Sequence, residues 1–323
     1  MAEPSLSLTF VELRRMVAHM LGYGRDDENW TDDQVEELDE IIGTGLQQFY
    51  FPPPLREGEL SHDWSFLKPI GSITTAAPYS TGTVTVVAGV VTLASGTFPS
   101  WAASGKFILD NVAYSVASRD SNTQITLDDT SVAAAAGTSY ELNQEDYDAP
   151  DAFGFIEGDM TFRNSDNVRF PVRLVAEAQI RSMRQANNMD GAPQLFAYRV
   201  KNNFNGTSGQ RYEFMFWPTP DAAYVGEYAY GVLADALTTT APYPFGGMTH
   251  GRCIMQACKA AAELHMDDEA GPHTAQFMMM LRAAISQDLK RTPEFLGYNG
   301  DRSDGDGMCR RRASVTYNGN NYP

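Results

Sequence analysis

Apolar residues recur at helical intervals in the first fifty positions of the chain, and a capping signal precedes each such stretch. The segment Thr9–Glu12 has the form of a capping box and opens an apolar stripe that runs from Phe10 to Leu21. A second box, Thr31–Gln34, opens another amphipathic segment, which Pro52–Pro54 ends. The pattern therefore predicts two helices joined by a short polar loop.

Three further helices are expected in the second half of the chain. Pro171 suits the first position of a helix that continues to about Ala186. Thr249 can cap a fourth helix, and Gly271–Pro272 separates that helix from a fifth. Because the first and last pairs of helices are amphipathic, we expect segments from both ends of the chain to pack in one bundle.

Short apolar runs with β-branched residues fill the segment from Thr83 to Leu127, and turn residues separate them. Ala88-Gly89, Asp110-Asn111 and Asp120–Asn122 tolerate the backbone angles that hairpin turns require. A small all-β module is therefore predicted between helices. We interpret residues 140–160 as a connection, and three later strands are expected: Leu195–Val200, Arg211–Trp217 and Val225–Val232.

Together these patterns predict an α+β fold. We expect a helical bundle with an inserted small all-β module, Ig-like or a small barrel, a second short antiparallel sheet and an extended C-terminal arm. The expected domains are residues 1–70 with 140–296 for the helical core and its short sheet, 71–139 for the β-module and 297–323 for the arm. The arm is rich in Gly, Asn, Asp and Arg, a composition that buries little surface.

Charge narrows the possible functions. The chain has 323 residues and a formal net charge of −17, with 24 basic and 41 acidic residues. DNA-gripping proteins depend on Lys and Arg contacts with phosphates, so we expect no tight DNA binding. The acidity suits either solubility alone or a wall that DNA slides past. No signal-peptide pattern and no apolar run long enough to span a bilayer is present, which predicts a soluble protein made in a cytosol, without membrane contact.

No reaction or cofactor is indicated by a motif. His250, His265 and His273 lie near acidic residues, but Glu263 and His265 are two positions apart on a predicted helix and so point to different faces. We therefore expect no metal site, no cofactor and no catalytic residue. The acidic stretch from Glu141 to Asp159 contains the one group of carboxylates that could hold a glycosidase pair.

The C-terminal arm carries the candidate partner-binding residues. Arg310, Arg311 and Arg312 form the basic cluster of this acidic chain, and docking on a neighbouring acidic subunit is favoured over contact with nucleic acid. A β-prone string follows the cluster, and an arm that carries a strand can pair with the sheet edge of another protein. The predicted binding residues are Arg310, Arg311, Arg312, Val315, Tyr317 and Tyr322.

The order of these parts resembles a known family. The segments Phe49–Pro53, Tyr147–Gly154 and Phe216–Pro220, with the inserted β-module and the two closing helices, resemble tailed-bacteriophage head-to-tail adaptor proteins, also called connector or head-completion proteins. The resemblance implies a structural virion protein of the phage neck, made in the host cytoplasm and without enzymatic activity. Simpler adaptors are mostly helical, so the β-module would be an addition on the outer face or rim.

The resemblance also implies partners. Copies of the chain would form a homomeric ring, commonly twelvefold, with the portal protein above and tail or nozzle proteins below. DNA would pass through the channel without specific binding, and no membrane would be involved.

Two alternatives remain at this point. The chain could be a tail, baseplate or capsid-decoration protein whose β-module binds carbohydrate or the capsid surface, with Trp64, Trp101 and Tyr114 as candidate platform residues. From another class, it could be an acidic glycoside hydrolase that uses the carboxylates between Glu141 and Asp159.

Overall fold

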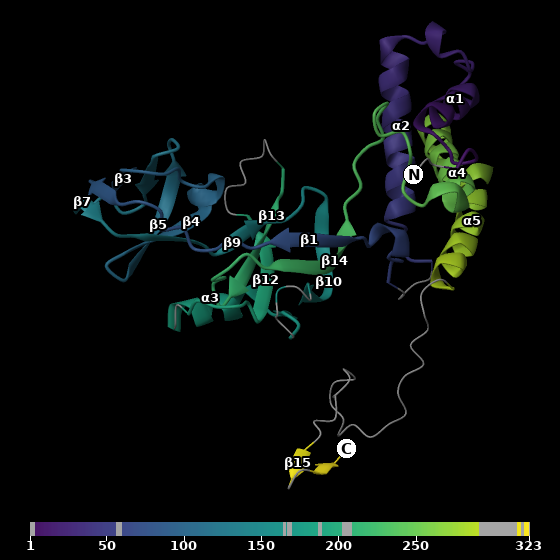
Figure 1. Cartoon of the computed structure of the whole chain (residues 1–323). Coiled ribbons are helices and arrows are strands. Elements are labelled where there is room, and N and C mark those ends of the chain that lie inside the picture. The colour runs from purple at the N-terminus through teal and green to yellow at the C-terminus, as the bar shows by residue number, and fades with distance from the viewer. Residues whose placement is uncertain are drawn as a thin grey trace.

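Three parts of the molecule lie in a row: a helical bundle, a central pair of sheets and a curled sheet at the far end (Figure 1). The computed structural model describes residues 4–55, 60–163, 166, 170–186, 189–201 and 209–290, together with the backbone of strands at 315–317 and 320–322. The predicted α+β fold class is confirmed. Within the described residues, none of the helices combines the length and the hydrophobicity that crossing a membrane requires.

The bundle joins helices from both ends of the chain. Both predicted capping boxes are present. The Thr9 side chain accepts a hydrogen bond from the Glu12 N–H, and the Thr31 side chain accepts one from the Gln34 N–H. In return, the side chains of Glu12 and Gln34 accept hydrogen bonds from the backbone N–H groups of Thr9 and Thr31. Gly22 ends the first helix in the left-handed conformation. The four helices are α1 (Phe10–Leu21), α2 (Asp32–Tyr50), α4 (Gly247–Asp267) and α5 (Pro272–Leu289).

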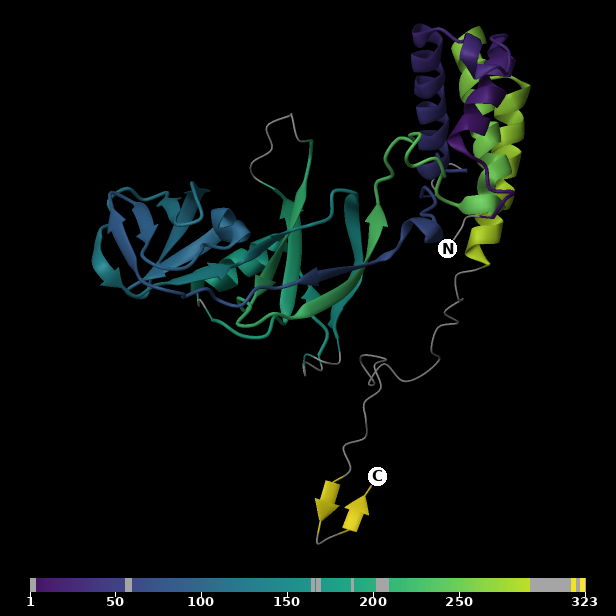
Figure 2. The ribbon, with the colours of Figure 1, turned by 45° about the horizontal axis from the view of Figure 1, so that its top comes forward.

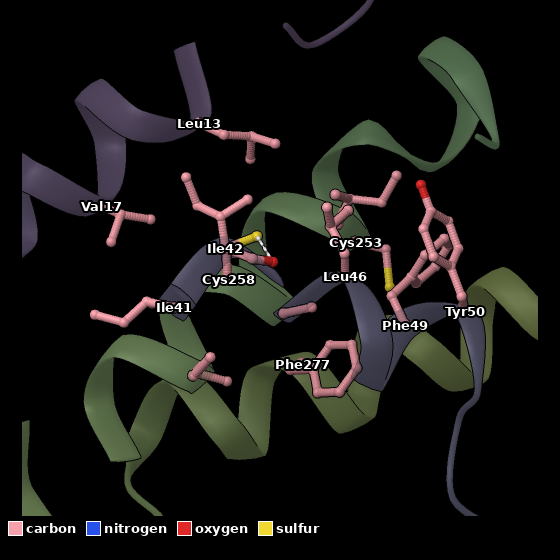
Figure 3. Close-up of a cluster of buried hydrophobic side chains, with 14 of the residues drawn as sticks. Leu13, Val17, Ile41, Ile42, Leu46, Phe49, Tyr50, Cys253, Cys258 and Phe277 are labelled. Carbon is pink, nitrogen blue, oxygen red and sulfur yellow. Dashed lines mark hydrogen bonds between the residues drawn. The ribbon is translucent and has the colours of Figure 1, made fainter. Parts of the chain in front are cut away.

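Helices α2 and α4 approach each other closely in the bundle. A Cβ atom added at Gly45 would lie 2.6 Å from the Cα atom of Cys258, so the absence of a side chain permits this crossing. The thiol of Cys258 points to the carbonyl oxygen of Ile42, and burial raises its pKa to about 12. Leu46 and Phe277 fill the space beside the crossing (Figure 3).

Trp64 packs at the end of this core that lies beside the C-terminal end of α2. Its indole Nε1 donates a hydrogen bond to the carbonyl oxygen of Phe49 at 2.8 Å, and the two rings lie 4.7 Å apart. The side chain is buried, with 1% of its surface exposed. Trp64 therefore fixes the segment that leaves the bundle, a short turn of 3-10 helix at Ser65–Leu67, against the end of α2.

Two packed sheets form the central part. Strands β1 (Ile70–Thr74), β14 (Val225–Val232) and β10 (Phe153–Phe162) make an antiparallel sheet, and β11 (Arg173–Leu174), β12 (Leu195–Val200), β13 (Tyr212–Trp217) and β9 (Asp146–Asp148) make the second. Between the sheets lies an aromatic core that contains Tyr147, Phe153, Phe196, Phe214, Phe216 and Tyr228. Helix α3 (Glu177–Ala186) covers the other face of the second sheet through Ile180, which packs with Met215.

Three sequence expectations about element boundaries are wrong. Residues 140–160 are not a plain connection, because they contain β8 (Glu141–Gln144), β9 and most of β10. Helix α3 begins at Glu177 and not near Pro171. The backbone N–H groups of Arg173 and Val175 instead donate hydrogen bonds to the carbonyl oxygens of Gln194 and Phe196, at the start of β12. Helix α4 begins at Gly247, after Gly246 in the left-handed conformation, and Thr249 is not its cap.

The β-module is one curled, seven-stranded antiparallel sheet that resembles half of a barrel. Ala88, Asp110 and Asn111 have positive φ, as the predicted hairpin turns require. Its apolar core is separate from the other clusters of the molecule. The strands, in spatial order, are β7 (Ala134–Thr138), β2 (Val84–Val87), β3 (Val90–Leu93), β6 (Gln124–Leu127), β5 (Val112–Arg119), β4 (Gly105–Leu109) and β8 (Glu141–Gln144).

The α2–α4 crossing gives a matched pair of substitutions with opposite expected signs. Gly45→Ala should lower the free energy of unfolding by roughly 1–3 kcal/mol, because the new methyl group meets the α4 backbone. Gly43→Ala, in the same helix but with nothing within 4 Å, should raise it by about 0.5–1 kcal/mol. Urea denaturation followed by circular dichroism measures both, and equal effects at the two positions would contradict the assigned crossing.

Candidate partner-binding elements and the joints that position them

The arm residues singled out from the sequence are only partly described. Arg310, Arg311 and Arg312 lie outside the described residues. Val315 and Tyr317 fall in strand β15 (Val315–Tyr317), and Tyr322 falls in β16 (Asn320–Tyr322). These two strands pair with each other in an antiparallel hairpin, Val315 opposite Tyr322. What the arm binds stays a prediction.

A buried carboxylate anchors the end of the bundle from which the chain leads toward the arm. Asp288 in the last turn of α5 accepts hydrogen bonds from the Ser65 N–H at 3.0 Å, from the Ser65 hydroxyl and from His62 Nε2 at 2.9 Å. Burial raises the pKa of Asp288, but the bonds from Ser65 and His62 outweigh it and hold the pKa below its ordinary value. This joint ties the segment that precedes β1 to the last helix of the bundle.

The acidic and histidine residues near the α4–α5 turn have separate structural roles. The carboxylate of Glu263 accepts hydrogen bonds from the N–H groups of Gly271, His273 and Thr274, and so caps α5 from within α4. His265 contacts Glu37 at 2.9 Å. Within the described part of the chain, no group of three or more side chains is arranged to hold a metal ion.

An arginine connects the β-module to the central sheets. Arg184 of α3 donates hydrogen bonds to the Asp146 carboxylate at 2.8 Å, to the Glu145 carbonyl oxygen at 2.8 Å and to the Phe216 carbonyl oxygen at 3.0 Å. Its side chain is 11% exposed. Glu145 links β8 of the module to β9 of the centre, which begins at Asp146, so Arg184 bonds both to this link and to the strand that follows it.

A second cation extends the network across the sheet. Arg199 lies 2.6 Å from Glu213 and 3.0 Å from Asp146. Burial lowers the pKa of Arg199, but the nearby carboxylates of Glu213, Asp146 and Glu177 raise it by a larger amount. The pKa of Arg199 therefore lies above its ordinary value. Lys106 of β4 lies 3.2 Å from the Glu145 carboxylate, which connects the module to the same network.

Most of the carboxylates considered for glycoside hydrolysis take part in structural ion pairs. Asp148 pairs with Lys201 at 2.6 Å and Glu157 with Lys68 at 3.0 Å, in addition to the pairs of Glu145 and Asp146. A glycosidase needs two carboxylates whose environments hold them in different protonation states. Separate neutralisation by neighbouring cations gives the hydrolase alternative no support.

The aromatic platform considered for carbohydrate binding is not formed. Trp64 lies in the core of the helical bundle and not in the β-module, so its candidate role as a platform residue is wrong. Trp101 and Tyr114 are half-buried and pack against the core of the module. A sugar platform needs broad exposed ring faces, which these contacts reduce.

Comparison with known proteins yields one family. A family model described as SU10 adaptor protein matches residues 97–296 of the chain. The match covers more than half of the sequence and runs from the β-module through the central sheets to the closing helices. No curated protein matches the chain.

The Arg184 joint gives a testable prediction. Arg184→Met should lower the free energy of unfolding by roughly 1–3 kcal/mol, because two buried carbonyl oxygens lose their donor. It should also speed proteolytic cleavage between the β-module and the central sheets. Arg181→Met is the matched control, since Arg181 lies on the same helix but is 68% exposed. Limited proteolysis with mass spectrometry measures the effect, and equal cleavage of both variants would contradict the assigned joint.

Asp288 predicts a pH dependence. Because its pKa in the folded protein lies below the ordinary 3.8, the stability from this group is present above that pH and is lost as the pH falls below it. Asp288→Asn should therefore lower Tm at pH 7, and its difference from the unmodified protein should narrow below about pH 4. Asp63→Asn, an exposed neighbour, is the control. A Tm difference that stays constant down to pH 3 would refute this role.

Proposed function

This chain belongs to the SU10 adaptor protein family, a family of structural phage adaptors, and we propose that it is a subunit of the phage neck that joins the portal to the tail. The observation that carries the proposal is the extent of the family match, which includes the β-module from residue 97 onward, the ion network and the closing helices. A structural role of this kind needs fixed joints between parts. The Asp288 and Arg184 contacts supply such joints.

In the proposed assembly, copies of the chain form a homomeric ring, commonly twelvefold, that leaves a channel for DNA. The portal protein would lie above the ring and tail or nozzle proteins below it. The net charge of −17 supports this proposal, because a strongly acidic wall repels phosphates and lets DNA pass without specific binding. The protein would act without a cofactor, in the virion at the portal vertex.

The parts of the chain would divide this work. Residues 1–70 and 140–296, apart from β8, would form the body of the ring together with β1, and the rest of residues 71–139 would join β8 in the β-module that projects from it toward the rim. The arm at 297–323 would engage an adjacent protein through Arg310, Arg311, Arg312, Val315, Tyr317 and Tyr322. The support for this division is the row of three parts, in which the β-module lies farthest from the bundle (Figure 1).

Size-exclusion chromatography with light scattering tests the ring. The full chain should elute as a ring, alone or when mixed with purified portal rings. A chain that ends at Gly297 should keep the same circular dichroism spectrum and Tm but bind portal at least roughly tenfold more weakly, because the arm and its arginines are missing. A full chain that stays monomeric and ignores portal would refute the ring, and equal portal binding by the shortened chain would refute the role of the arm.

A further inference from the structure

The outer face of α2 carries a row of carboxylates that have no cationic partner within the described part of the chain. Asp32, Glu36 and Glu40 follow one another at four-residue intervals, so they share one face of the helix, and all three are exposed. None of them forms a salt bridge with another described residue. The helix dipole favours a carboxylate in the first turn, but Glu36 and Glu40 lie beyond it, where like charges four residues apart repel.

Helix α4 carries a face of the opposite character. Met248, Arg252, Met255 and Lys259 follow at intervals of four, three and four residues and therefore form one stripe. Met248 is 50% exposed, Arg252 is exposed, and Met255 and Lys259 are half-buried. Neither cation forms a salt bridge with a described residue.

The neighbouring helix α5 reinforces this character. Its only acidic residue is Asp288, which is buried against Ser65 and His62. Its exposed face presents Arg282 and Met279, the latter 66% exposed. In a chain with a net charge of −17, the face that carries Arg252, Lys259 and Arg282 is therefore locally basic, and the exposed acidic residues of this region, Asp267, Asp268 and Glu269, lie at the C-terminal end of α4 and just beyond it.

The two faces point to opposite sides of the bundle. Helix α4 meets α2 through Ala257 and Cys258, and the Met248–Lys259 stripe lies on the other side of α4. In both views of the ribbon, α2 stands on one side of the bundle and α5 on the other (Figure 2). A surface and its complement on opposite sides of one subunit give a head-to-tail contact, which closes into a ring when the rotation between copies closes.

We propose that the acidic face of α2 in one copy packs on the basic, methionine-bearing stripe of α4 in the next copy. This inference rests on the proposed ring and names the surfaces that build it. At about 1.5 Å per residue, the acidic row from Asp32 to Glu40 extends about 12 Å and the stripe from Met248 to Lys259 about 17 Å, so the two faces are similar in length. Methionine side chains adapt their shape to a partner, and the arginine and lysine offset the carboxylates.

A second copy of the chain fits these surfaces better than other occupants. DNA could meet the α4 stripe but would be repelled by the α2 face, so it would leave the acidic row without a partner. A copy of the chain supplies both complements at once. It also relieves the repulsion between Glu36 and Glu40, which nothing in the described part of a single subunit does.

Charge reversal tests the contact. One variant carries Glu36→Lys and Glu40→Lys, and a second carries Arg252→Glu and Lys259→Glu. Each alone should raise the protein concentration needed for assembly by roughly tenfold or more, because like charges meet at every contact. Mixed together, the two variants should assemble again, since the reversed α2 of one meets the reversed α4 of the other. A chain with all four substitutions should also assemble.

The controls separate this inference from the ring itself. Asp128→Lys with Asp235→Lys makes the same change in net charge as the α2 variant at exposed positions that belong to neither face, and it should leave assembly unchanged. Light scattering of the full chain, with and without portal rings, is the measurement, and circular dichroism verifies folding. Restoration in the mixture or in the four-substitution chain supports the contact.

Four outcomes would overturn the inference. If the unmodified chain assembles and neither reversed variant is impaired, or if neither form of restoration occurs, the contact is wrong while the ring stands. If the Asp128 and Asp235 control is impaired as strongly as the α2 variant, net charge and not the α2 face governs assembly. If the unmodified chain never assembles, both the proposed ring and this contact are refuted.

Discussion

The close crossing of α2 and α4 at Gly45 is the contact on which the rest of the architecture depends. It brings Ile42 and Cys258, 216 positions apart, into one core. Everything between these helices must therefore leave the bundle and return to the same place. Strands β1 and β14 carry the chain out and back as a directly paired couple, with Gly71 opposite Tyr228. The central sheets and the β-module are therefore formed by the part of the chain between α2 and α4, and the contact between these two helices holds both ends of that part together.

The acidic charge of the chain is handled in two different ways. In the centre, carboxylates are neutralised one by one: Asp146 contacts both Arg184 and Arg199, and Glu145 contacts Lys106. Partly buried pairs of this kind contribute less to stability than to geometry, because desolvation offsets much of the attraction. On the outer face of α2, Asp32, Glu36 and Glu40 are exposed and form no salt bridge with another described residue. The first arrangement fixes the shape of one subunit, whereas the second leaves charge available for a neighbour.

Local signals explain what the sequence predicted well. The capping boxes at Thr9 and Thr31 are relations within four residues, and the hairpin turns at Ala88-Gly89 and Asp110-Asn111 depend on neighbouring residues alone. Strand β10 was missed for a physical reason. Its buried residues Phe153, Ile156 and Met160 are three and four positions apart because register shifts interrupt the strand, so the two-residue alternation that identifies strands is absent.

The remaining differences come from contacts between distant residues. Strand β11 exists because Arg173 and Leu174 pair in parallel with Leu195 and Phe196, and no local pattern announces such a pairing. The burial of Trp64 depends on Phe49. The ion network joins Glu145, Arg184, Arg199 and Glu213, which lie far apart in the sequence. The sequence identifies the charged residues, but it does not show which of them form ion pairs with one another. The arm residues named from composition stay a prediction about partners.

The position of the β-module depends on this network more than on apolar packing. Its apolar core and that of the central sheets are separate clusters, so the hydrophobic effect stabilises each part but does not fix their relative orientation. Hydrogen bonds from a planar guanidinium are directional, and Arg184 makes them to Asp146, Glu145 and Phe216 at once. In a ring, any tilt allowed in one subunit would be repeated in every copy. A directional joint therefore suits a structural protein whose projecting modules must take the same orientation.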